Sequence, residues 1–342
     1  MKTAIVTGSC GLIGSEVSEY FHDRGFRIIG IDNDGRSQYF GPEASTRYMV
    51  ERLRGLKNYT HYDIDITRIG ALDVLRGERV DVIIHTAAQP SHDWASSDPF
   101  TDFNVNAFGT LNMLEYLRHN RPEAVFVYTS TNKVYGDRPN YITDYVESAT
   151  RWNPVDKDIL LFGIDESMSI DNCKHSLFGV SKAYGDLIVQ EYGRYYGFKT
   201  AVFRGGCLTG RNHTGVKAHG FLSYLVKCAQ NGVKYYINGF KGKQVRDNIH
   251  SEDVAAAFYE FYKNPKSGAV YNLGGGMKSN CSILEAISII EELSGLVVDY
   301  EVLDVERDGD HIWYVSDTRK FRMDYPGWVQ NHDLRSIIRG ML

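Results

Sequence analysis

Short hydrophobic runs and amphipathic segments alternate along the first 205 residues of the chain. β-branched runs predict buried strands at Thr3–Val6, Arg27–Ile31, Val80–His85, Ala124–Thr129 and Thr200–Phe203. Between these runs, hydrophobic residues recur at helical spacing in Ile13–Arg24, Ile69–Arg76 and Asn106–Arg118. Strands that alternate with helices form parallel sheets covered on both faces. The pattern therefore predicts a doubly wound α/β fold.

The alternation weakens after Gly205. The stretch 206–244 is rich in loop residues around one expected helix, Gly220–Gln230. A strand at Ala269–Gly274 and a helix at Ser282–Leu293 follow. We expect a main domain of residues 1–205 and 245–275, and a smaller, discontinuous α/β substrate lobe of residues 206–244 and 276–342.

Composition excludes several classes of protein. The chain has 342 residues, and 38 Lys and Arg against 43 Asp and Glu give a net charge of −5. This mild acidity argues against nucleic acid or an anionic membrane as the main partner. No apolar run approaches the roughly 18 residues that span a bilayer. The five scattered cysteines include no CxxC pair, so we expect no disulfide framework, no structural zinc and a cytoplasmic location.

A glycine-rich segment follows the first expected strand. Gly8, Gly11 and Gly14 form a GxxGxxG pattern that contains Leu12 and Ile13 and opens an amphipathic helix. Glycines there let backbone amides approach a pyrophosphate, and the helix N-terminus adds partial positive charge. Because a strand precedes the pattern and a helix follows it, we interpret it as the dinucleotide loop of a Rossmann-type domain.

An acidic residue stands at the end of the second expected strand. Asp32, followed by Asn33, lies eighteen residues beyond Gly14. A carboxylate at this place hydrogen-bonds the ribose hydroxyls and repels a 2′-phosphate, so NAD is favoured over NADP. The alternative is an Asp that only forms a turn.

Further motifs occur in a fixed order. They are Asp63-Ile64, His85-Thr86-Ala87-Ala88, Asn106 to Thr110, Thr129 to Gly136, Phe178 to Lys182, Arg204, and Arg246 to His250. Their order resembles the extended short-chain dehydrogenase/reductase family, in particular its nucleotide-sugar epimerases and dehydratases. The resemblance covers nearly the whole chain. It implies a Rossmann fold, NAD as cofactor, a nucleotide-sugar substrate and a homodimer.

One segment separates the subgroups of this family. The dehydratases carry Asp-Glu where this chain has Asn132-Lys133, and without that pair water loss has no general acid. The string from Ser130 to Asp137 is instead similar to the CDP-paratose (CDP-tyvelose) 2-epimerases. Such enzymes oxidise C2 of a CDP-linked hexose, let the keto sugar present its other face, and return the hydride. Another epimerisation, such as a 4-epimerisation, and a net oxidoreduction are the alternatives.

The resemblance also implies roles for individual residues. Thr131 would hydrogen-bond the hydroxyl that is oxidised, and Lys182 the nicotinamide ribose; a backbone-satisfying hydroxyl and a solvated lysine are the structural alternatives. The expected cofactor contacts are Gly8, Gly11, Leu12, Ile13, Gly14, Asp32, Asn33, Asp63, Ile64, Thr86, Ala87, Ala88, Asn106, Thr129 and Lys182. The expected substrate contacts are Gln89, His92, Thr131, Asn132, Lys133, Arg204, Arg246 and Arg307. The three arginines are diphosphate candidates, or else ion-pair partners. His213, His219 and His250 are too dispersed in sequence to indicate a metal.

Phe178 departs from the family pattern. It stands four residues before Lys182, where the family has its tyrosine base, and a phenyl ring cannot accept a proton. Three explanations remain open: an engineered Tyr→Phe change, a natural subgroup with another base, or a silent protein that only binds NAD and a sugar nucleotide. The candidate substitute bases are Tyr184, His175, Lys133, His92 and Asp93.

Overall fold

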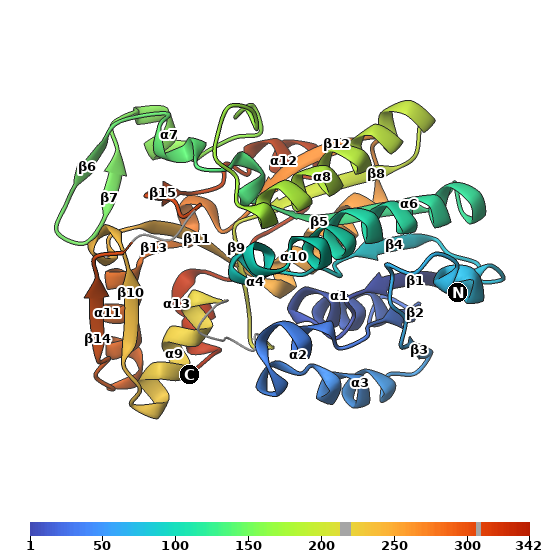
Figure 1. The fold of residues 1–342 in the computed structure, drawn as a ribbon, viewed down its shortest axis with the longest axis horizontal. Helices are drawn as coiled ribbons and strands as arrows, with labels where there is room; N and C mark the ends of the chain where they lie inside the picture. The colour runs from blue at the N-terminus through green and yellow to red at the C-terminus, as the bar shows by residue number, and fades with distance from the viewer. Residues whose placement is uncertain (213–219, 306–308) are drawn as a thin grey trace. The chain divides into compact units, whose positions relative to one another are not determined.

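The computed structural model describes residues 1–212, 220–305 and 309–342, in two compact units (Figure 1). The first unit contains residues 1–134, 177–204 and 254–271, and the second contains 135–176, 205–253 and 272–342. Segment 135–176, expected in the main domain, thus clusters with the later part of the chain. Its β-bridge from Ile164 to Ser316 is one reason for this grouping.

A seven-stranded sheet organises the first unit, with strand order β12-β8-β5-β4-β1-β2-β3. The pairings of β1 with β2 and β4, of β2 with β3, and of β4 with β5 are parallel. The strands are β1 (Lys2–Thr7), β2 (Phe26–Ile31), β3 (Tyr59–Tyr62), β4 (Val82–His85), β5 (Val125–Thr131), β8 (Thr200–Gly205) and β12 (Ala269–Leu273). The order reverses between β1 and β4, which is where open α/β sheets bind their ligands. The doubly wound α/β prediction is confirmed.

Helices cover both faces of this sheet. They are α1 (Leu12–His22), α2 (Gly35–Phe40), α3 (Arg47–Arg54), α4 (His92–Ser97), α5 (Pro99–Phe103), α6 (Gly109–Asn120), α8 (Leu177–Tyr196) and α10 (Ser251–Lys263). Helices α6 and α8 run side by side (Figure 1) and bury Met113, Leu117 and Val189 in one core with Phe126. On α1, Phe21 packs against Tyr259 of α10, with ring centroids 5.4 Å apart.

Two expected helices differ from their predicted form. The segment Ile69–Arg76 holds only a 3-10 turn, Ala71–Leu75, because Gly70 precedes it at φ +80° and the helix does not extend. The predicted helix Asn106–Arg118 begins as a π turn, Asn104–Phe108, before α6. The helices expected from Ile13, Gly220 and Ser282 are present as α1, α9 (Phe221–Asn231) and α11 (Ile283–Ser294).

The second unit holds smaller sheets and its own hydrophobic core. Its strands are β6 (Tyr145–Glu147), β7 (Trp152–Pro154), β9 (Cys207–Thr209), β10 (Tyr235–Asn238), β11 (Val245–His250), β13 (Asn280–Ser282), β14 (Tyr300–Leu303) and β15 (Trp313–Tyr314). Besides α9 and α11, its helices are α7 (Lys157–Phe162), α12 (Arg319–Asp324) and α13 (Leu334–Arg339). Leu225, Ile287 and Ile337, from α9, α11 and α13, meet in one buried cluster. Among the described residues, the longest apolar helix falls short of what crossing a membrane requires.

Candidate dinucleotide and sugar site

The glycine loop between β1 and α1 has a backbone conformation that favours glycine. Gly8 has φ +66°, and its amide donates to the carbonyl of Ile31 at 2.7 Å. A Cβ at position 14 would stand 2.0 Å from the carbonyl oxygen of Gly8. Gly11 is the N-cap of α1, and in this fully described helix no acidic side chain occupies the first turn. The N-terminal amides are therefore open to a phosphate, and the loop fits a dinucleotide.

Asp32 lies beside this loop. Its carboxylate accepts the backbone N–H of Cys10 and that of Asp34, each at 2.9 Å, which holds it at the end of β2. Burial raises the pKa of Asp32, and these two backbone N–H groups oppose that rise. Asn33 is exposed, and its side chain accepts the backbone N–H of Gly35. The carboxylate is thus fixed where a ribose would meet it.

We expect Asp32→Asn to weaken NAD binding by about tenfold, since a charge-assisted hydrogen bond is worth roughly 1.5–3 kcal/mol. The same change should narrow the preference for NAD over NADP, because the repulsion of a 2′-phosphate is lost. Calorimetric titration with both dinucleotides measures this, with the exposed Asp23→Asn as matched control. An unchanged ratio of the two dissociation constants would show that Asp32 only shapes the turn.

Other expected cofactor residues lie in the same unit and differ in how exposed they are. Thr86 donates its hydroxyl to the carbonyl of Thr7 at 2.7 Å. Ile64, Ala87 and Ala88 are half-buried, and Asp63 is exposed. These residues follow β3 and β4, on the edge where parallel strands present their carboxyl ends.

Two expected ligand contacts are instead buried in the interior. The side chain of Gln89 is fully buried and donates to Asp102 at 2.8 Å and to the carbonyl of Ser91 at 2.9 Å. Asn106, also buried, donates to Asp102 and to Ser181. The expectation that Gln89 contacts the sugar and Asn106 the cofactor stays a prediction, and in this structure both side chains bond within the protein. Their side-chain amides form a buried hydrogen-bond network that joins α5 and the π turn to α8.

Lys182 lies on the buried face of α8, one helical turn after Phe178. Its ammonium donates to the backbone carbonyl of Thr129 at 2.7 Å and lies 4.3 Å from the centre of the Tyr128 ring. Burial lowers the pKa of Lys182 to about 7, while the carboxylates of Asp186 and Asp102 act in the opposite direction. The solvated-lysine alternative is thus wrong.

Thr131 ends β5, two residues beyond Thr129. Its hydroxyl oxygen accepts the backbone N–H of Lys133 at 3.2 Å and donates to the side chain of Asn132 at 3.3 Å. Asn132 is buried, whereas Thr131 and Lys133 are half-buried. Thr131 and the carbonyl of Thr129, which accepts from Lys182, therefore lie together at the end of β5.

Arg204 lies in the interior of the first unit. Its guanidinium donates to both oxygens of Asp186, at 3.0 and 2.8 Å, and both side chains are almost wholly buried. Asp186 also accepts from Ser130 at 2.6 Å. This arrangement is the ion-pair alternative for Arg204, and its diphosphate role stays a prediction. Asp186, an acid four residues beyond Lys182 on the same helix face, was the available signal for this ion pair.

The remaining arginine candidates belong to the other part of the chain. Arg246 is buried in the second unit and donates to its neighbour's carbonyl, that of Val245, at 2.7 Å and to Asp310. Arg307, His213 and His219 lie outside the described residues. A diphosphate role for Arg246 and Arg307 stays a prediction.

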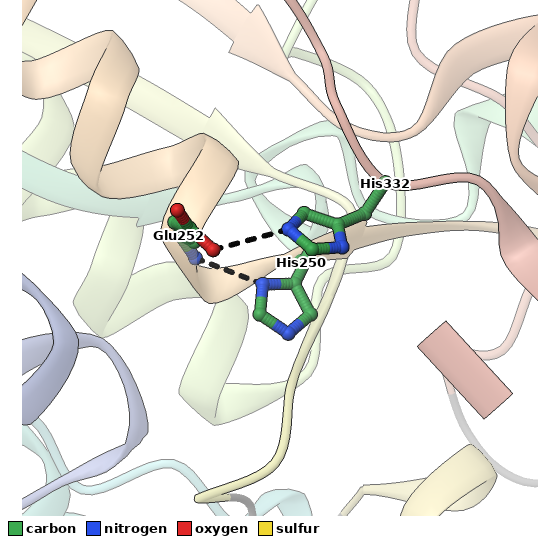
Figure 2. A group of neighbouring side chains, drawn as sticks. All are labelled: His250, Glu252 and His332. Atoms are coloured by element: carbon green, nitrogen blue, oxygen red, sulfur yellow. Dashed lines mark hydrogen bonds and ion pairs between the residues drawn. The ribbon is translucent and has the colours of Figure 1, made fainter. Parts of the chain in front are cut away.

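A histidine cluster in the second unit was not foreseen from the sequence (Figure 2). The rings of His250 and His332 stack with centroids 4.0 Å apart, and Nε2 of His332 lies 3.1 Å from Glu252. Nδ1 of His250 accepts the backbone N–H of Glu252 at 3.1 Å. One potential metal-ligating atom of each residue lies within 4.8 Å of the others, and hydrogen bonds engage Nδ1 of His250 and Nε2 of His332. The cluster therefore ties the segment around His332 to the start of α10.

We expect His250 to titrate far below an ordinary histidine. Burial, then the neighbouring His332, lower the pKa of His250 to about 4. Because the neutral ring is favoured in the folded state, protonation costs stability as the pH falls from about 6.5 towards 4. Nitrogen-15 NMR of the imidazole, assigned with His250→Gln, measures the midpoint. A midpoint above pH 6 would contradict the burial argument.

Known proteins are similar to this chain over most of its length. Residues 4–274 match the model of the NAD dependent epimerase/dehydratase family. CDP-paratose 2-epimerase of Salmonella typhi is 31% identical over 327 residues, covering 92% of this chain and 91% of that protein. A dTDP-glucose 4,6-dehydratase of Neisseria meningitidis is 27% identical over 358 residues, covering 99% and 92%.

Solved structures share the fold. A Tyr-to-Phe mutant of UDP-glucuronic acid 4-epimerase from Bacillus cereus, in complex with NAD and a fluorinated UDP-sugar, has TM-score 0.80 at 21% identity, covering 99% of this chain and 97% of that chain. UDP-glucose 4-epimerase of Thermus thermophilus, in complex with NAD, has TM-score 0.77 at 24% identity, covering 99% and 97%. The fold and the family match together identify the chain as a member of the NAD-dependent epimerase/dehydratase family, with NAD as its cofactor.

Proposed function

We propose that this protein epimerises C2 of a CDP-linked hexose of the paratose type. The sequence similarity to CDP-paratose 2-epimerase, over nine-tenths of both chains, carries the proposal. Asn132 and Lys133 support it, because a dehydratase needs an acid pair there for water loss. The relatives also include a putative UDP-glucose 4-epimerase at 25% identity, so 4-epimerisation is the rival reaction.

The residues of the first unit have defined tasks in this reaction. The glycine loop and Asp32 hold the dinucleotide, which when bound takes up and returns the hydride of the sugar carbon. Lys182 keeps the potential at the end of β5 positive, which favours the developing alkoxide of the sugar. Thr131, at that strand end, offers a hydroxyl to the sugar oxygen. Lys182, Thr131 and the dinucleotide loop all belong to one unit.

A panel of sugar nucleotides tests this proposal. The NAD-loaded protein is incubated with CDP-paratose, UDP-glucose and dTDP-glucose, and the products are separated by ion-exchange chromatography. We expect conversion of CDP-paratose alone, without added reductant, because an epimerase regenerates its NAD in each cycle. Conversion of UDP-glucose to a 4-epimer would support the rival reaction.

Phe178 favours a second candidate, a protein that binds NAD and a sugar nucleotide without turnover. The phenyl ring is 7% exposed and offers no proton acceptor. Binding of CDP-paratose without conversion, in both the wild type and Phe178→Tyr, would support this candidate. Conversion by the wild type would exclude it.

We also propose a homodimer formed through α6 and α8, and a cytoplasmic location. On the outer face of α8, Val180 and Leu187, seven residues apart, are 53% and 48% exposed. Apolar side chains at this spacing form a stripe that a second copy would cover. Light scattering should give twice the chain mass for the wild type and a single chain mass for Leu187→Glu.

A further inference from the structure

The imidazole of His92 lies against the ring of Phe178. Their centroids are 4.8 Å apart and the ring planes make an angle of 55°. His92 begins α4, and Phe178 is in the first turn of α8, one turn before Lys182. Phe178 is buried, whereas His92 is half-buried. An ionisable ring therefore lies beside Phe178, whose own ring cannot exchange a proton.

Hydrogen bonds hold the backbone on both sides of His92 in place. The hydroxyl of Ser91 accepts the backbone N–H of Trp94 at 3.1 Å and so caps α4. The buried amide of Gln89 donates to the carbonyl of Ser91 and to Asp102, as described above. Because α4 and α5 both pack on α8, the backbone of His92 is held at a set distance from Phe178. The imidazole is placed by the fold, which a proton-transfer group requires.

Three of the other candidate bases have surroundings that the structure describes. The ring of Tyr184 packs on Phe103 of α5, at 6.0 Å, roughly 240° around α8 from Phe178. Asp93 is exposed. His175 belongs to the second unit, where its ring lies 3.6 Å from the sulfur of Cys173. The ring of His92 contacts that of Phe178.

We propose that His92 is the proton acceptor of the sugar oxidation, in place of the tyrosine that the family carries four residues before the lysine. This inference rests on the proposed function. The O–H bond of the sugar hydroxyl breaks and its proton moves to a ring nitrogen of His92. A carbonyl forms as the hydride of the same carbon passes to oxidised NAD. On return of the hydride, the imidazolium gives the proton back to the sugar oxygen. An imidazole suits this exchange because its ordinary pKa lies near neutrality.

Four variants test the assignment: His92→Gln, Phe178→Tyr, the double variant, and His119→Gln as matched control. His119 lies on the exposed side of α6, so its change should leave turnover within about twofold. We expect His92→Gln to lower kcat at least about 100-fold, with KM changed only a few fold. Adding Phe178→Tyr to His92→Gln should restore at least about tenfold, because it returns a phenol next to Lys182. Turnover by His92→Gln at more than a third of the wild-type rate would overturn the inference.

A second readout does not depend on turnover. In NAD-loaded protein, the imidazole nitrogen-15 signals of His92, assigned by their loss in His92→Gln, should shift when CDP-paratose is added. Unchanged signals while calorimetry shows CDP-paratose binding would overturn the inference, because the ring would then not meet the sugar. If the wild type converts no sugar nucleotide of the panel, the proposed function fails and the inference fails with it. If the wild type and His92→Gln convert CDP-paratose equally, only the inference fails.

Discussion

Replacing Asp186 by alanine should lower the free energy of unfolding by about 3–5 kcal/mol, because it leaves a buried guanidinium without its counter-ion. Arg204 and Asp186 have side chains only 6% and 1% exposed, and two hydrogen bonds join them. Asp186 also accepts from Ser130 and Gln190, each at 2.6 Å. Three donors thus lose their acceptor in one substitution. Urea unfolding followed by circular dichroism measures the loss.

An exposed ion pair provides the control for this prediction. Arg335 and Glu292 are 44% and 62% exposed, so Glu292→Gln should leave the free energy of unfolding nearly unchanged. The double variant Arg204→Met with Asp186→Leu should recover much of the loss, since no buried charge is left unpaired. Equal losses for Asp186→Ala and Glu292→Gln would contradict the burial argument.

Replacing Lys182 by methionine should lower turnover by at least about 100-fold, the scale on which electrostatic stabilisation of a developing charge acts. The ammonium is buried and bonded to the carbonyl of Thr129, at the strand end that carries Thr131. Methionine keeps the volume and removes the charge. We expect NAD binding to weaken as well, because the resemblance places this lysine at the nicotinamide ribose. Steady-state rates and calorimetric NAD titration measure the two effects.

A control variant at a surface lysine distinguishes an effect on the site from an effect of losing any positive charge. Lys199→Met, at an exposed position, should keep turnover and NAD affinity within about twofold. Thermal unfolding of Lys182→Met should show a folded protein. A folded Lys182→Met with turnover within threefold of the wild type would show that the lysine serves only the packing of α8.

The sheet and the dinucleotide loop were predictable because their sequence signals are local. A β-branched run at Thr3–Val6 needs burial on both sides, Gly8 has a positive φ that favours glycine, and Gly14 leaves no room for a Cβ. Strand and helix periodicity predicted β1, β2, β4, β5 and β8 within two residues at each end, and the helices α1, α9 and α11. The family motifs added Lys182, which no local pattern distinguishes from a surface lysine.

The partners of polar side chains were not predictable in the same way. Gln89, Asn106 and Arg204 stand at motif positions, but their hydrogen bonds go to Asp102, Ser181 and Asp186, which the chain brings in from distant segments. Likewise, 86 positions separate His92 from Phe178 in the sequence, and only the packing of α4 on α8 brings the two rings together. Pairings of this kind depend on tertiary structure, so the sequence indicates candidates and not contacts.

Proton NMR of CDP-paratose incubated with the NAD-loaded protein in D2O tests the central claim, the C2 epimerisation, most directly. The account predicts a second CDP-sugar with inverted configuration at C2 and with protium retained there, because the hydride that leaves the carbon returns to it. Deuterium at C2, or an unchanged spectrum after prolonged incubation while the protein binds the sugar nucleotide, would contradict it.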